Sequence, residues 1–435
     1  MRKTLLFALV LLSIVAVGQN SLANELTEAL ARKAVSERAA ESAPAIAELR
    51  AMGPTGLKTL LDRYTDDIKQ HIDDPTLGRT PDWDRIANAL DAVSQQKDSY
   101  LSGLYWYTDL REAQKVAAAS GKPILSLRLL GNLNDEFSCA NSRFFRTVLY
   151  SNADVSAMLR QHFVLHWQSV RPAPRVTIDF GDGRKLERTI TGNSIHYVLD
   201  SDGRPIDALP GLYGPQAFLK ALMEAELITE QVRANGVNRQ QLLANYQRSR
   251  LAKISTDWVT DTTKIGGQIP EGFAVEKNRS GEAISIAPLA VTKALTEASI
   301  LRSITAGTEA LGRITDEAAW NKIASLHATE TKLDARSISL IRRQVRGMAD
   351  AGPALDDLLK KFQQSIALDT VRNEYLLHSK VYSWLLNDRN QMDVDRLNEK
   401  VYAELFLTPR SDQWLGLFSA NVYTALDNNG VVEDR

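Results

Sequence analysis

The stretch DLREAQKVAAASGKPILSL, residues 109–127, decides the fold, because its pattern changes from helical to extended within a few residues. Its first part predicts a helix from Asp109 to Ser120, which ends at Gly121-Lys122-Pro123. The next residues, Ile124 to Leu129, form a short apolar run that predicts a buried strand. A helix followed directly by a strand indicates an α/β unit.

The residues that follow continue this alternation of helices and strands. A loop leads to a helix that starts around Cys139, and a short helix at 154–161 precedes the β-rich run Phe163 to Trp167. Asp200-Ser201-Asp202-Gly203 is typical of a hairpin turn. The remaining predicted elements are strands at 175–180, 194–199 and 206–208 and a closing helix at 216–227.

Two helical regions flank the α/β unit. Residues 24–103 show helical spacing of apolar side chains, with a break at 53–56 and a helix start at Thr80-Pro81-Asp82. Residues 229–435 return to helical periodicity, with an irregular connection at 261–282 and the longest helical run at 355–386. The sequence therefore predicts a helical N-terminal region, an α/β domain at 104–228 and a larger helical C-terminal region.

Four phrases of the central domain carry a resemblance to a known family. They are the stretch at 109–127, SCANSRFF at 138–145, ADVSAMLRQHFVLHW at 153–167 and SIHYVLDSDGRPI at 194–206. In this order they resemble the first helix and strand, the active-site turn, the next helix and strand, and the terminal hairpin of divergent secreted bacterial thioredoxin-like proteins. The resemblance implies an α/β thioredoxin-like domain between the two helical regions.

Residues 1–23 are typical of a secretory signal peptide. Arg2 and Lys3 precede an apolar run from Thr4 to Val17, and small residues stand at Ser21 and Ala23 before the expected cleavage site. The run is shorter than the roughly 20 apolar residues that span a bilayer, so a retained membrane anchor is the less favoured interpretation. The prediction is a periplasmic or secreted protein with no integral membrane segment after cleavage.

The composition limits the classes of partner. Lys and Arg number 52 against 53 Asp and Glu, so the formal charge of -1 gives no reason to expect a nucleic-acid partner. No dinucleotide, P-loop, zinc-protease or serine-hydrolase motif is present, and we predict no cofactor. A protein or a small thiol is the expected partner, and the oligomeric state stays open.

Cys139 is the only cysteine of the chain, so no intrachain disulfide can form. A cysteine at a helix start has its thiolate favoured by free backbone N–H groups. The resemblance implies that Cys139 to Ser142 replaces a Cys-x-x-Cys motif as Cys-x-x-Ser, with Ser142 in place of the resolving thiol. A monothiol exchange protein follows as one hypothesis, with Cys139 and Ser142 as the catalytic candidates and an external thiol completing each cycle.

The alternative hypothesis is a binding or scaffold protein of the cell envelope that kept the fold and lost the redox chemistry. The family carries a cis-proline opposite the active-site turn, and the resemblance implies that Ser194 stands at that position. Cys139 is then a small packing residue. Ser194, His196 and Trp106 are the binding candidates: His196 lies two residues from Ser194, and Trp106 could line a peptide groove or belong to the core.

The histidines give little support to a metal site. His162 and His166 would share one face of a strand, because they are an even number of residues apart. Simple packing explains them as well, and no metal site is predicted.

Overall fold

The computed structural model describes residues 25–74, 77–189, 192–234, 238–267, 315–345, 352–387, 393–415, 425–426 and 431. The predicted signal peptide and most of the predicted connection at 261–282 lie outside these residues.

The N-terminal region is helical, as predicted. A first helix at 25–34 is followed by α2 (Ala39–Ala51), α3 (Pro54–Arg63), α4 (Thr65–Asp73), α5 (Pro81–Ser94) and the 3-10 turn η1 (Ser99–Leu101). The predicted start of α5 is confirmed, since the Thr80 hydroxyl accepts a hydrogen bond from the Trp83 N–H and caps the helix. These helices pack around their own apolar core, which also takes in Leu340 from the C-terminal region.

A five-stranded mixed sheet forms the centre of the molecule. Its strands are β1 (Trp106–Tyr107), β2 (Ile124–Leu130), β3 (Val164–Arg171), β6 (Ile195–Leu199) and β7 (Pro205–Pro210), in the order β1-β3-β2-β6-β7. β1 and β2 both run parallel to β3, while β6 runs antiparallel to β2 and to β7. The strands predicted at 124–129 and 163–167 are confirmed, and they lie next to each other in the sheet.

The connections of the sheet follow from local sequence signals. Asp109 caps the helix α6 (Leu110–Ser120), which ends at Gly121 with a positive φ. After β2 come α7 (Ala140–Phe144), the π-helical turn η2 (Phe145–Tyr150) and α8 (Ala153–His162). The predicted turn at 200–203 joins β6 to β7, with Gly203 at φ +80°.

Several predicted boundaries need correction. The strand β5 (Lys185–Thr189), which pairs with β4 (Arg175–Asp179) in a separate two-stranded sheet, was not predicted, because its side chains are almost all polar. His162 ends the helix α8, so it does not share a strand face with His166. The helix α9 (Pro215–Ala234) continues past residue 228, since Ile228 and Val232 pack on Ile206 of β7.

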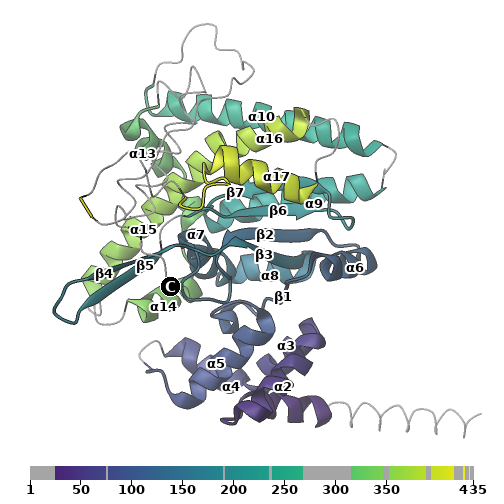
Figure 1. Cartoon of the computed structure of the whole chain (residues 1–435). Coiled ribbons are helices and arrows are strands. Elements are labelled where there is room, and N and C mark those ends of the chain that lie inside the picture. Colours follow the sequence, from purple (N-terminus) through teal and green to yellow (C-terminus); the bar gives the residue numbers. More distant parts are fainter. Residues whose placement is uncertain are drawn as a thin grey trace, which may run out of the picture.

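The C-terminal region is helical, as predicted, and it shares the core of the sheet. Figure 1 shows α10, α16 and α17 along one side of the sheet, while the N-terminal helices α2–α5 lie at the opposite end of the molecule. One apolar cluster joins sheet residues such as Leu127 to Val381 of α16 and Leu397 of α17. The elements are α10 (Arg239–Lys264), α13 (Glu317–Leu326), η4 (Ala328–Thr331), α14 (Ala335–Gln344), α15 (Gly352–Arg372), η5 (Asn373–His378), α16 (Ser379–Asn387), α17 (Val394–Lys400) and η6 (Val401–Leu405).

The fold is therefore a mixed α/β arrangement with a helical C-terminal region that packs on the sheet. Of the helices that the structure describes, none combines the length and the apolar composition needed to cross a bilayer.

Candidate functional site

The Cys139 turn lies where β2 ends and α7 begins. The Cys139 N–H donates a hydrogen bond to the carbonyl of Leu130, the last residue of β2, with an N to O distance of 3.1 Å. Cys139 itself is the N-cap of α7, and its carbonyl accepts from the N–H of Arg143. The turn is thus tied to the sheet on one side and to the helix on the other.

Two serines surround the sulfur of Cys139. The Ser194 hydroxyl lies 2.9 Å from Sγ, and the Ser142 hydroxyl lies 3.4 Å from it. The Ser142 hydroxyl donates to the Cys139 carbonyl, which closes the helix turn. The structure therefore brings together Cys139, Ser142 and Ser194, three of the five residues singled out from the sequence.

The C-terminal region covers this site. Tyr402 of η6 donates its hydroxyl to the Asn193 carbonyl at 2.9 Å, and the Asn193 amide donates to the Thr408 hydroxyl at 2.9 Å. The Arg171 guanidinium holds the same segment through the carbonyls of Thr408, Pro409 and Asp412. The Cys139 side chain is 0% exposed beneath this cover.

His196 and Trp106 belong to the core around the Cys139 turn. The His196 Nε2 atom is 2.7 Å from the Tyr150 hydroxyl, and burial lowers the pKa of His196 to about 3, so its imidazole is neutral. Trp106 is fully buried on β1 and donates its indole N–H to the Gln96 side chain. A neutral His196 supplies no charge to a thiolate, and the buried Trp106 lines no open groove.

The two arginines nearest the turn direct their guanidinium groups elsewhere. Arg146 donates to the carbonyls of Leu133 and Asp135, and Arg143 donates to the Thr189 hydroxyl. Burial lowers the pKa of both arginines, although neither loses its charge at neutral pH. Arg146 thus stabilises the loop before α7, and Arg143 ties α7 to the end of β5.

A second polar site, the Asp207 cluster, lies on the edge strand β7. There the buried carboxylate of β7 meets side chains from three C-terminal helical elements, α10, η5 and α16. The His378 imidazole bridges two acids, with Nε2 3.1 Å from the Asp207 carboxylate and Nδ1 2.8 Å from that of Glu374. The cluster consists of Asp207, Tyr246, Arg250, Glu374, His378 and Tyr382.

The charges of the Asp207 cluster compensate one another. Burial opposes the charged form of His378, but Glu374 and Asp207 outweigh it and raise its pKa to about 9. Burial likewise opposes the charged carboxylates, yet contact with His378 keeps the pKa values of Asp207 and Glu374 below their usual range. The cluster is an electrostatic link between β7 and the C-terminal helices.

The sequence analysis does not predict this cluster, because His378 lies in a helical region with no motif around it. One local signal was available: Glu374 and His378 stand four residues apart, a spacing that places both on one helix face. Their partner Asp207 is distant in sequence, and no local pattern connects it to them.

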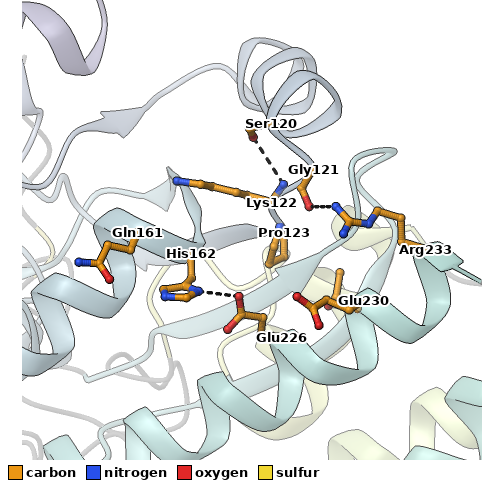
Figure 2. Close-up of a pocket in the computed structure, with 10 residues that line it drawn as sticks. Ser120, Gly121, Lys122, Pro123, Gln161, His162, Glu226, Glu230 and Arg233 are labelled. Carbon is orange, nitrogen blue, oxygen red and sulfur yellow. Dashed lines mark hydrogen bonds and ion pairs between the residues drawn. The ribbon is translucent and has the colours of Figure 1, made fainter.

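A polar surface pocket of about 230 Å³ lies between α6, α8 and α9, away from Cys139 (Figure 2). Its charged groups are largely engaged: His162 Nδ1 is 2.7 Å from the Glu226 carboxylate, and Arg233 donates to the Gly121 carbonyl. Among the described residues, no group of three or more His, Cys, Asp or Glu side chains could hold a metal ion.

Comparisons with known proteins add no relative. No family model, no curated protein and no solved structure matches the chain. The site and its chemistry are therefore interpreted from the residues themselves.

Proposed function

We propose that the sheet and its helices form a divergent thioredoxin fold that serves as a non-catalytic binding scaffold. The order of elements supports this assignment. A helix and strand (α6, β2), a turn at Cys139, a second helix and strand (α8, β3) and a terminal antiparallel hairpin (β6, β7) follow one another in the order that the sequence resemblance implies.

The burial of Cys139 is the observation that carries the non-catalytic assignment. A thiol that exchanges with a disulfide needs an in-line approach to its sulfur, so it has to be accessible. Cys139 is 0% exposed, and Tyr402 and Thr408 hydrogen-bond to Asn193, whose carbonyl lies 3.9 Å from the sulfur. Its sulfur lies among two serine hydroxyls and a carbonyl, which suits a small packing side chain.

Monothiol exchange through Cys139 is the second candidate function. The placement of Cys139 at the N-cap of α7, with Ser142 one turn later, favours it. In that mechanism the Cys139 thiolate attacks one sulfur of a partner disulfide, a mixed disulfide forms, and the other sulfur leaves as a thiolate. An external thiol then attacks the mixed disulfide and releases Cys139, since Ser142 cannot do so. This function requires the cover over Cys139 to open.

Alkylation of the single thiol separates the two functions. Iodoacetamide is added to the folded full chain and to the denatured chain across a range of pH, and modification is followed by mass spectrometry. The scaffold function predicts that Cys139 of the folded chain reacts only when the cover opens locally or the chain unfolds, and hence far more slowly than in the denatured chain, at every pH at which the chain stays folded. Rapid reaction of the folded chain below about pH 7 would overturn it in favour of monothiol exchange.

The cellular location is part of the same proposal. The signal-like residues 1–23 support export, and a scaffold of the cell envelope would act through surface contacts with protein partners. Cys139→Ser should then leave partner binding unchanged.

A further inference from the structure

The β4–β5 hairpin is the most exposed regular element of the described chain. Figure 1 shows it extending away from the central sheet on the side opposite α6. Among the described strands, β4 and β5 pair only with each other, in a register that places Thr177 opposite Glu187. Two-stranded hairpins are marginally stable in water by themselves, and a free strand edge is a template for pairing with another chain.

The hairpin has one apolar and one polar face. Val176 and Ile178 of β4, and Phe180 directly after it, share a face with Leu186 of β5. Arg184 and Arg188 border this face, and the Arg184 guanidinium lies 5.4 Å from the centre of the Phe180 ring. Ile178 is 38% exposed and Phe180 is 54% exposed, and neither belongs to any apolar cluster of the described residues. The face thus leaves apolar surface uncovered next to an unpaired strand edge.

The outer edge of β4 presents its backbone groups at alternate residues. The Phe180 N–H donates to the Arg184 carbonyl directly opposite, so that pair is hydrogen-bonded within the hairpin. Because such pairs alternate in an antiparallel ladder, the N–H and C=O groups of Arg175, Thr177 and Asp179 point outward. These three residues can form a ladder with another strand.

The sequence of β4, RVTID, is complementary to itself when one copy runs antiparallel to the other about Thr177. In that register Arg175 lies opposite the partner's Asp179, and Val176 lies opposite the partner's Ile178. In this register the outward N–H and C=O groups of Arg175, Thr177 and Asp179 face those of the partner strand and can hydrogen-bond with them. A slip by one residue would set polar against apolar faces, and a slip by two would separate the opposite charges.

The outer edge of β5, KLERT, lacks this complementarity. The same self-pairing about Glu187 would set two carboxylates opposite each other and place Leu186 against Arg188. Like charges directly opposite each other destabilise a strand pair. The charge pattern therefore selects β4 over β5 as the edge that pairs.

We propose that two copies of this chain form a two-fold symmetric dimer through their β4 edges. The two hairpins become one four-stranded antiparallel sheet in the order β5-β4-β4-β5, and the apolar faces of the copies join into one stripe. The interface is isologous, because each copy contributes the same residues. This inference goes beyond the proposed function and does not depend on Cys139.

Two charge reversals test the dimer on the full chain by sedimentation velocity over a range of concentrations. Asp179→Arg places Arg opposite Arg at two symmetric positions, and Arg175→Glu does the same with carboxylates. Each variant alone should dimerise about tenfold more weakly than the natural chain. An equimolar mixture of the two variants restores both opposite-charge pairs, so it should form a heterodimer of nearly natural affinity.

The matched control is Arg188→Glu, which changes an exposed charge on β5 that lies opposite Val176 rather than opposite Arg175 or Asp179, and it should leave dimerisation unchanged. Rescue in the mixture also excludes misfolding as the cause of a loss. The proposal is overturned if the natural chain stays monomeric at every concentration. It is also overturned if Asp179→Arg leaves the dimer affinity unchanged, or if the mixture of variants does not regain that affinity.

Discussion

The C-terminal helices close over the sheet at two places, and the two places differ in chemistry. At the Cys139 turn the covering segment is held by hydrogen bonds to hydroxyl and carbonyl groups, including those from the Arg171 guanidinium, and the buried side-chain oxygens of Ser138 and Asn141 have no hydrogen-bond partner within the described part of the chain. At the Asp207 cluster the contacts are charged, and each carboxylate meets at least one cation. The region that resembles an active site is therefore the less strongly bound, and the stronger attachment lies at β7.

The largest expected effect comes from removing Asp207. Asp207→Ala leaves His378 buried with one fewer counter-charge and leaves the hydroxyls of Tyr246 and Tyr382 without their acceptor. Removing one member of a buried ion pair typically costs about 3–5 kcal/mol of unfolding free energy. Urea denaturation followed by circular dichroism measures the loss.

The control for this variant is Asp257→Ala, which removes an exposed i,i+4 pair with Lys253 on α10. Its expected cost is below about 1 kcal/mol. Equal effects of the two variants would show that the Asp207 cluster does not hold the C-terminal helices.

The second effect is a loss of stability in alkali. The pKa of His378 rises from 6.5 to about 9 on folding, so the folded chain binds this proton more tightly than the unfolded chain does. The contribution of this proton to the free energy of unfolding is complete below about pH 6.5, and it disappears as the pH rises through about 9. A shift of this size corresponds to roughly 3 kcal/mol of unfolding free energy.

Urea denaturation at a series of pH values between neutral and alkaline checks this dependence. His378→Gln should flatten the curve in that window. A residual slope should remain from His327, because hydrogen bonding to Glu330 and Asp261 outweighs burial and raises its pKa to about 9 as well. A natural chain with constant stability across the window would contradict the assignment of a charged His378.

The smallest effect concerns the cover over the Cys139 turn. Tyr402→Phe removes one hydrogen bond to the Asn193 carbonyl, at a cost of about 1 kcal/mol. If the cover opens locally, the same change raises the alkylation rate of Cys139 about fivefold. Tyr105→Phe is the control, since it loses a similar bond to the Arg50 carbonyl in the N-terminal region and should leave alkylation unchanged.

Local signals predicted much of the sheet. Helix caps and turn residues such as Asp109, Gly121 and Gly203 stand at the element ends where the sequence placed them. The strand β5 was missed because Lys185 to Thr189 has no apolar alternation of its own and becomes a strand only through its pairing with β4. Local pattern carries little information on such a strand.

The candidate site likewise has a part that local sequence signals predicted and a part that they could not predict. Cys139, Ser142 and Ser194 were predicted together and lie together. The cover by Tyr402 could not be predicted, since it joins residues 209 positions apart in the chain. The Asp207 cluster was missed for the same reason, because its contacts are set by the packing of distant helices.

The apolar core shared by the sheet and the C-terminal region has a consequence for the order of folding. Leu104 and Leu405 belong to one apolar cluster, so the core closes only after nearly the whole described chain is available. Contacts of such long sequence separation slow folding, because the chain loses loop entropy before it gains the contacts. During synthesis from the N-terminus, the core cannot form until the last helices have been made. The unfolded apolar segments depend on protection from aggregation during that interval.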